Sequence, residues 1–416
     1  MTIKPEILYI AHRIPYPPNK GDKIRSFNEI RYLSKQFVID LVCLADDPGD
    51  LSHATALKKY CRRVAVFSLN PVIGKLKGLF ALVTGRSISE GYFYHLGMAA
   101  TIKRWLTRHP YRAVLCFSSP MARYLESTMT IFPGNRPGLI MDFCDLDSDK
   151  WHQYAHTAAF PLNWIYQVEA RRLLAFEKKI NRWFDSCVFV SDKEGVLFKT
   201  LFPGARNVVS IPNGVDVDYF TPGICKKFKA SEPQKPHIEK TLMFAGVMDY
   251  HANVDGMLWF CDTVFPRIKE KLPGTRLVIA GSNPASAIQR LGKHKDIIVT
   301  GFVPDMRLWY CRADVCIVPL RIARGVQNKV LEAMAMTKPV VATSQALQGI
   351  SAIPHQHLVV ADQVEIFANS VVELLNDSAR AGELGVEARK FVISDHSWDF
   401  HMARFSSLVL GSGIVK

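Results

Sequence analysis

At 416 residues, the chain is longer than one hydrophobic core normally supports, so two domains are expected. A hydrophobic content of 48% and a mean hydropathy of +0.05 exclude an intrinsically disordered chain. The net charge of +14 predicts an acidic partner, which could be a nucleotide phosphate, an anionic membrane surface or a nucleic acid.

The first half of the chain predicts a parallel sheet covered by helices on both faces. Helical patterns such as 24–36 and 163–184 alternate with short apolar runs that are rich in β-branched residues. These predicted strands are 7–13, 37–45, 63–69, 113–119, 138–143 and 186–191.

The same alternation starts again after the Pro- and Gly-containing segment 211–222 and a polar, Lys-rich stretch at 225–240, which is the candidate linker. The predicted strands of this second set are 241–247, 276–282, 297–302, 314–320, 339–343 and 358–361, and the helices include 254–272, 364–377 and 397–410. The fold class is therefore α/β, with two tandem Rossmann-like, doubly wound domains. We expect residues 1–213 in the first, joined by a returning helix at 397–416, and 214–396 in the second. Such domains bind ligands at the carboxyl ends of their strands.

The nine cysteines form no CxxC pair and fit neither a disulfide framework nor a zinc site, so we expect small buried side chains in a reducing compartment. The first residues lead directly into a strand without the pattern of a signal peptide. No apolar run reaches the roughly 18 residues of a membrane span. These features predict a cytoplasmic protein, which could act at the inner face of the plasma membrane.

The segment from Gly325 to Thr343 has the pattern of a glycine turn, a short helix and a proline-led strand. Gly325 allows a close approach of the backbone, and the amides at the helix start can receive an anion. Lys329 adds a positive charge, and Glu332 lies nearby on the helix as an acceptor suited to a sugar hydroxyl. The segment suits the diphosphate and ribose of a nucleotide-sugar. The alternative is an ordinary helix start with a solvated Lys and Glu.

Several motifs together resemble the GT-B glycosyltransferases of the large retaining family 4, also called glycosyl transferases group 1. The resemblance covers nearly the whole chain, through PYPPNKGDKIRSFNEI, IPNGVDVDYFTP, FAGVMDYHANVDGMLWF, LVIAGSNP, VTGFVPDMRLWYCRADVCIVPL and GVQNKVLEAMAMTKPVV. Within that family the chain is most similar to the bacterial sugar transferases of exosortase/PEP-CTERM exopolysaccharide systems, through the segments MDYHANVDG and DFCDLDSDKW.

The chain departs from the family pattern at two places. Family members usually carry a Glu eight residues before the position of Glu332, and it contacts the donor sugar; here that residue is Arg324. They also tend to carry an Arg and a Lys after the glycine of the second domain's first strand, whereas Gly246 to Trp259 contains neither. The positive charges have moved to Arg321, Arg324 and Lys329, where they can still neutralise a diphosphate leaving group.

The resemblance implies a set of donor contacts in the second domain. Lys329, assisted by Arg321 and Arg324, is expected at the diphosphate, and Glu332 at the ribose. Gly246, Gly281 and the turn at 301–303 end strands where the nucleobase is expected.

In the first domain, the turn at Gly21 opens a helix whose amides could approach the donor phosphate or the acceptor. Asp142 and Asp145 are the candidate catalytic residues, either as a base on the acceptor hydroxyl or as groups that position the acceptor. Capping of a turn is the alternative for both. His12 and His251 are left unassigned. No metal site emerges, and we expect neither a metal nor another cofactor.

The segment 70–89 places basic residues on an otherwise apolar stretch, a pattern that suits an anionic membrane surface. Residues 1–150 also hold 21 Lys and Arg against 13 Asp and Glu, which is most of the excess charge. The alternative is a helix that faces the core and exposes its lysines.

The sequence therefore predicts a hexosyltransferase that moves a sugar from a nucleoside diphosphate to a lipid-linked or other glycan acceptor, with retention as the family outcome. A nucleotide-sugar 2-epimerase of the same fold and a non-catalytic member are the alternatives. A nucleic-acid partner is not expected, because no interleaved basic and aromatic strand, helix-turn-helix or zinc pattern is present. The sugar, the nucleotide and the oligomeric state are not predicted.

Overall fold

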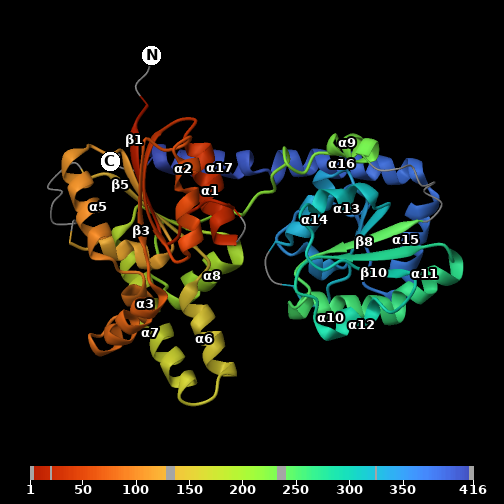
Figure 1. Cartoon of the computed structure of the whole chain (residues 1–416), viewed down its shortest axis with the longest axis horizontal. Helices are drawn as coiled ribbons and strands as arrows, with labels where there is room; N and C mark the ends of the chain where they lie inside the picture. The colour runs from red at the N-terminus through yellow and green to blue at the C-terminus, as the bar shows by residue number, and fades with distance from the viewer. Residues whose placement is uncertain (1–3, 19–20, 128–135, 232–239, 324–325, 412–416) are drawn as a thin grey trace. The chain divides into compact units, whose positions relative to one another are not determined.

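The computed structural model describes residues 4–18, 21–127, 136–231, 240–323 and 326–411. The chain divides into two compact units, one formed by residues 1–212 with 401–416 and the other by residues 213–400 (Figure 1). Each unit is a parallel sheet covered by helices, which confirms the predicted fold class of two Rossmann-like domains.

The first unit contains a seven-stranded sheet in the order β3-β2-β1-β4-β5-β6-β7, and every neighbouring pair is parallel. Strand β1 is apolar and completely buried from Ile7 to Ala11, as expected for a central strand covered on both faces. The strands are β1 (Glu6–Ala11), β2 (Val38–Ala45), β3 (Arg63–Ser68), β4 (Ala113–Phe117), β5 (Gly138–Cys144), β6 (Ser186–Phe189) and β7 (Val208–Ser210).

The helices of this unit include the two that were predicted, at slightly different bounds. They are α1 (Gly21–Leu33), α2 (Ala54–Leu57), α3 (Pro71–Val83), α4 (Ile88–Tyr92), α5 (Leu96–Arg108), α6 (Asp147–Thr157), α7 (Leu162–Trp183) and α8 (Asp192–Leu201), with 3-10 turns η1 (Pro48–His53) and η2 (Ser119–Leu125). Helices α3, α6 and α7 project from one end of the unit (Figure 1).

The second unit contains a six-stranded sheet in the order β10-β9-β8-β11-β12-β13, also parallel throughout. Its strands are β8 (Thr241–Ala245), β9 (Arg276–Ala280), β10 (Ile297–Val299), β11 (Val315–Val318), β12 (Val340–Ala342) and β13 (Val359–Val360). Its helices are α9 (Ile224–Ser231), α10 (His251–Trp259), α11 (Phe265–Lys271), α12 (Ser286–Leu291), α13 (Met306–Arg312), α14 (Asn328–Ala335), α15 (Val364–Asn376) and α16 (Ser378–Asp395), with the π turn η4 (Phe260–Val264) and the 3-10 turn η5 (Ser344–Leu347).

The last helix, α17 (Trp398–Gly411), belongs from His401 onward to the first unit. Its Ser406 hydroxyl donates to Gln36, which follows α1, over 3.0 Å. Part of the chain's end therefore packs with its beginning.

Two expectations about the second half were wrong. The segment 225–240 is not simply a linker, because its first part lies in helix α9, whose Ile224 and Cys225 pack against the core; residues 232–239 lie outside the described part of the chain. Cys225 of α9 also forms a disulfide with Cys311 of α13, so the nine cysteines are not all reduced. The sequence separation of 86 residues gave no spacing signal for this pair.

Candidate functional site

Two strand ends in the second unit meet at a pair of glycines. Gly246 follows β8 and Gly281 follows β9. Gly281 has a φ of 148°, and a Cβ at this position would lie 1.6 Å from the carbonyl oxygen of Gly246. Only glycine fits there, because any side chain would overlap the neighbouring backbone.

The side chain of Lys329, on α14, reaches Gly246 at the end of β8. Its Nζ donates a hydrogen bond to Oδ1 of Asn253 on α10, and lies 4.6 Å from the centre of the Phe244 ring. The Asn253 amide nitrogen in turn donates to the Val247 carbonyl over 2.8 Å. A Cβ on Gly246 would lie 2.7 Å from the Asn253 amide nitrogen and 3.2 Å from the Lys329 nitrogen, so this glycine makes room for the pair.

These residues line a pocket of about 550 Å³ at the start of α10. Its lining residues are Gly246, Val247, Asp249, Tyr250, His251, Asn253, Gln327 and Lys329. The first amides of a helix lack partners within the helix and favour an anion, and Lys329 adds a cation to the same pocket. The arrangement suits a phosphate-bearing ligand.

Burial lowers the pKa of Lys329 to about 8, although the charge of Glu332 acts in the opposite direction. An incoming anion would favour the charged form of the amine again. Lys329 is therefore a cation whose charge responds to what enters the pocket.

Glu332 lies one turn further along α14. It accepts a hydrogen bond from the hydroxyl of the buried Tyr310 over 3.0 Å. Burial raises its pKa, while Tyr310 and Lys329 act to lower it. Glu332 does not line the pocket, and its contact with ribose stays a prediction.

The other predicted cations are placed differently. Arg321 is bound to Asp255 of α10, with its Nε 3.0 Å from a carboxylate oxygen, and would have to leave that partner to reach a phosphate. Arg324 and Gly325 lie outside the described residues.

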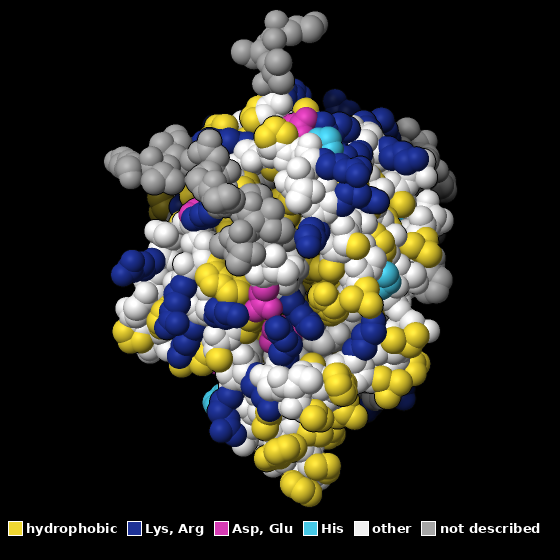
Figure 2. Space-filling model, turned by 90° about the vertical axis from the view of Figure 1, so that its left-hand side faces the viewer, with side chains coloured by type: hydrophobic (Ala, Val, Ile, Leu, Met, Phe, Trp, Pro, Cys, Tyr) yellow, Lys and Arg dark blue, Asp and Glu magenta, His cyan; other side chains and the backbone are white. Residues whose placement is uncertain are grey.

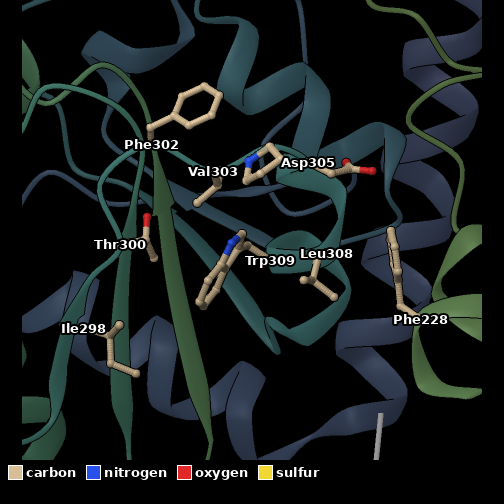
Figure 3. A pocket seen from close by; sticks show the side chains of 9 residues that line it. Phe228, Ile298, Thr300, Phe302, Val303, Asp305, Leu308 and Trp309 are labelled. Carbon is tan, nitrogen blue, oxygen red and sulfur yellow. The ribbon is translucent and has the colours of Figure 1, made fainter. Parts of the chain in front are cut away.

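A second cavity of about 550 Å³ lies beside the turn at Gly301, where the nucleobase was expected. Gly301 has a φ of +66°, and Phe302 is largely exposed at the rim. Figure 3 shows the Trp309 indole between Thr300 and Leu308, on a wall that is mostly apolar. The Thr300 hydroxyl accepts from the amide of Gly281 over 3.3 Å, which connects this turn to the glycine pair.

In the first unit, Asp142 is buried and forms an ion pair with Arg25. The Asp142 carboxylate lies 2.7 Å from a guanidinium nitrogen of Arg25 and accepts from the amide of Cys144 over 2.8 Å. Arg25 also lies 3.2 Å from Glu29 and donates to the Ile211 carbonyl. Only 2% of Asp142 is exposed and its charge holds β5 to α1, so the structure gives it a structural role, and its catalytic role stays a prediction.

Asp145 and Gly21 remain candidates. The Asp145 carboxylate is partly exposed and lies 2.9 Å from the Lys150 amine. The same amine lies 3.3 Å from the Asp147 carboxylate. Gly21 begins α1, and a Cβ there would meet nothing within 4 Å, so the fold itself does not require glycine.

Three residues of these sites were not predicted. Asn253 and Asp255 hold Lys329 and Arg321 in place, and Tyr310 holds Glu332. All three come from helices whose relation to α14 depends on the tertiary fold. The one signal in the sequence was the absence of Lys and Arg between Gly246 and Trp259, which indicated that the cation of this pocket comes from another segment.

Within the described ranges, no three His, Cys, Asp or Glu side chains are arranged to hold a metal ion. Among the same residues, no helix combines the length and the hydropathy that a membrane span requires.

Comparison with known proteins finds similarity to glycosyltransferases. Residues 239–377 match the family profile of glycosyl transferases group 1. A GDP-mannose-dependent alpha-(1-6)-phosphatidylinositol monomannoside mannosyltransferase of Mycobacterium tuberculosis is 25% identical over 277 residues, which cover 63% of this chain and 70% of the relative. A GDP-mannose-dependent monoacylated alpha-(1-6)-phosphatidylinositol monomannoside mannosyltransferase of Corynebacterium glutamicum is 24% identical over 61% of this chain and 69% of its own length.

Two of the similar solved structures have the same fold. The sucrose-phosphate synthase of Thermosynechococcus elongatus superimposes with a TM-score of 0.64 at 16% identity, covering 98% of both chains. The Anabaena protein HepE in complex with UDP superimposes with a TM-score of 0.64 at 15% identity, covering 98% of this chain and all of HepE.

Proposed function

We propose that this chain, which has the GT-B fold and matches the glycosyl transferases group 1 profile over residues 239–377, transfers a sugar from a nucleoside diphosphate to a lipid-linked saccharide. The setting we propose is exopolysaccharide or cell-surface glycan synthesis, with retention of the anomeric configuration. The single observation that carries the donor assignment is the pocket at Lys329, Asn253 and the start of α10.

The chemistry of transfer requires what this pocket supplies. The bond between the sugar C1 and the phosphate oxygen breaks with its electron pair on the diphosphate, while the acceptor oxygen bonds to C1 and loses its proton. Negative charge therefore grows on the diphosphate, and preorganised donors at that point stabilise the transition state. Lys329 and the first amides of α10 line the pocket in which the diphosphate would lie.

The names of similar proteins support the partner classes. HepE was solved with UDP, and the mycobacterial relative uses GDP-mannose and acts on a phosphatidylinositol mannoside. By analogy, we propose a nucleoside diphosphate sugar as donor and a glycolipid as acceptor.

An exposed apolar surface on the first unit, which we propose faces the membrane, supports the lipid-linked acceptor. Helix α3 exposes an apolar face instead of packing it against the core, with Phe80 68% and Val83 83% exposed. The remaining large exposed apolar side chains of this helix are Val72, Ile73, Leu76 and Leu79. Lys75 and Lys77 are exposed on the same helix. Large apolar side chains with flanking lysines suit the boundary between headgroups and acyl chains of an anionic bilayer.

The turn between α6 and α7 adds a second apolar projection. Phe160 is 81% exposed, and Leu162 and Trp164 at the start of α7 are also exposed. Arg172 of α7 donates to the carbonyl groups of Leu82 and Arg86, so α7 packs beside the end of α3. Figure 2 shows hydrophobic side chains gathered towards the lower end of this face, with Lys and Arg side chains around and above them.

The membrane proposal is tested by co-sedimentation with vesicles of phosphatidylcholine containing about 30% phosphatidylglycerol. We expect the double variant Leu76→Ser/Phe80→Ser to lose most of its binding, because each side chain contributes roughly 1.5–3 kcal/mol when it is buried. The matched control is Ile366→Ser/Val386→Ser, which removes exposed apolar side chains from the second unit. Equal binding of both double variants would contradict the assignment.

Donor binding is tested by thermal shift against UDP-, GDP-, ADP- and TDP-sugars. We expect one nucleotide to stabilise the protein, and the effect to disappear in Lys329→Met. Stabilisation that persists unchanged in this variant would contradict the placement of the donor.

A further inference from the structure

The carboxyl ends of β1, β4 and β5 bring three segments of the first unit together. In the sheet register Ala11 pairs with Phe117, and Phe117 pairs with Asp142. The next residues along β1 and β4, His12 and Ser118, therefore lie side by side at this edge of the sheet. Ligands bind at this edge in doubly wound sheets.

His12 is held in a defined orientation. Its ring stacks on Phe117 with a centroid distance of 5.8 Å and meets the edge of Phe93 at 5.4 Å. Its Nε2 lies 3.3 Å from a carboxylate oxygen of Asp22 in α1. Asp22 is bound in turn by Arg13 over 2.9 Å.

Asp22 engages one nitrogen of His12 and leaves the other for a ligand. Burial acts to raise the pKa of Asp22, but His12 and Arg13 outweigh it and hold that pKa well below its usual range. A carboxylate accepts hydrogen bonds, so Nε2 is the donor in this contact, and a neutral imidazole then offers Nδ1 as an acceptor. Nδ1 is buried and has no hydrogen-bond partner among the described residues.

Ser119, the first residue of η2 just beyond the end of β4, supplies a second buried polar atom. Its side chain is fully buried, and its Oγ likewise has no partner within the described ranges. The residue before it, Ser118, has a φ of +75°, a costly conformation for a residue other than glycine. Buried polar atoms without partners cost free energy, so two that follow adjacent strands at a ligand-binding edge require an explanation.

We propose that His12, oriented by Asp22, and Ser119 form a binding site for a saccharide hydroxyl. The hydroxyl donates its hydrogen to Nδ1 of His12, and its oxygen accepts from the Ser119 hydroxyl. This inference rests on the proposed function and adds a contact of the first unit with a saccharide, beside the acceptor role predicted for Asp142 and Asp145. The charged groups around His12 include Asp22 with its partner Arg13 and, on α6, Asp147, which interacts with His12 electrostatically.

The main test uses His12→Phe, which preserves a ring against Phe117 and Phe93 but removes both nitrogens. We expect kcat/KM for the acceptor to fall about 10- to 100-fold, because a substrate hydroxyl loses its partner in a buried site. His12→Asn restores an acceptor atom at nearly the position of Nδ1, so we expect it to recover part of that loss. Ser119→Ala should give a smaller loss in the same direction.

The matched control is His109→Phe. His109 also lies near a carboxylate, 3.8 Å from Glu6, but at the opposite edge of the same sheet. We expect it to leave kcat/KM within twofold of the wild type. Thermal unfolding and the Kd for the free nucleoside diphosphate are measured for every variant, so that a folding defect is recognised.

The source of the hydroxyl is resolved by two arms of the experiment. If His12→Phe weakens binding of the nucleotide-sugar but not of the free nucleotide, the hydroxyl belongs to the donor sugar. If it raises only the KM of the acceptor, the hydroxyl belongs to the acceptor. A folded His12→Phe protein with unchanged values in both arms overturns the site, whereas a wild-type protein that transfers no sugar at all refutes the proposed function instead.

Discussion

The charge of Lys329 gives the sharpest prediction of the donor site. We expect Lys329→Met to weaken binding of the nucleoside diphosphate without unfolding the protein, because methionine keeps most of the side-chain length. A hydrogen bond to a charged group contributes about 1.5–3 kcal/mol, which corresponds to a Kd that is roughly 10- to 150-fold higher. Isothermal titration with UDP and GDP measures this value directly.

The pH dependence tests the same residue independently. The pKa of Lys329 is about 8 in the empty pocket, and a bound diphosphate should raise it, so binding takes up a proton above pH 8. The affinity of the wild type should therefore fall by up to about tenfold per pH unit above pH 8. Lys329→Met should lack this loss of affinity.

The free energy of unfolding of the ligand-free protein should rise with pH, whereas the affinity for nucleotide falls. The pKa of Lys329 is 10.5 in the unfolded chain and about 8 in the folded protein, so between these values the unfolded chain binds a proton that the folded protein does not. The contribution of Lys329 to stability is therefore lowest below pH 8 and rises as the pH rises towards 10.5. Equal Kd values of wild type and Lys329→Met for nucleoside diphosphate across pH 7 to 10 would refute the role of Lys329 as the cation of the donor site.

Four further predictions follow from single contacts. Asn253→Leu should raise the Kd for nucleoside diphosphate less than Lys329→Met does, because the ammonium remains but loses its fixed position; a larger effect, measured by the same titration, would contradict this order. Arg25→Met should destabilise the first unit by about 3–5 kcal/mol by leaving a buried carboxylate unpaired, and an unchanged denaturant midpoint would be inconsistent with that ion pair. Cys225→Ser should cost about 2–4 kcal/mol, and peptide mapping without reductant should find the disulfide in the wild type. Gly281→Ala should abolish thermal stabilisation by nucleotide, since the added carbon overlaps a backbone oxygen; full stabilisation would show that the strand end can move.

The architecture was predictable because its signals are local and repeated. Strand β1 was expected at 7–13 and is found at Glu6–Ala11, and the helix expected at 163–184 is α7, Leu162–Trp183. An apolar run bounded by Gly and Pro predicts a buried strand without knowledge of the rest of the chain. The helix expected at 254–272 was less accurate, because it divides into α10, a π turn and α11.

The residues of the sites were predictable only in part. Lys329 could be selected because a glycine turn and a helix start surround it in the sequence. Asp142 was selected because it ends a strand, but its burial with Arg25 depends on a residue 117 positions away. The pair of His12 and Asp22 was missed because a single histidine carries little information until its carboxylate partner is known.

The disulfide and the exposed face of α3 illustrate the same limit. Cys225 and Cys311 meet only when α9 packs on α13. In the segment 70–89, composition could not distinguish a helix that faces the core from one that faces outward, and the structure shows that most of its large apolar side chains are exposed.

The most direct test of the central claim measures sugar transfer into lipid. The protein is incubated with each radiolabelled UDP-, GDP-, ADP- or TDP-sugar and with anionic vesicles that carry a lipid-linked saccharide, and label is counted in the organic phase. The proposed function predicts label from one donor with the wild type, and at least a tenfold loss with Lys329→Met. Label that enters the lipid equally well with Lys329→Met would contradict the assigned donor site, and the absence of label from every donor with the wild type would contradict the proposed reaction.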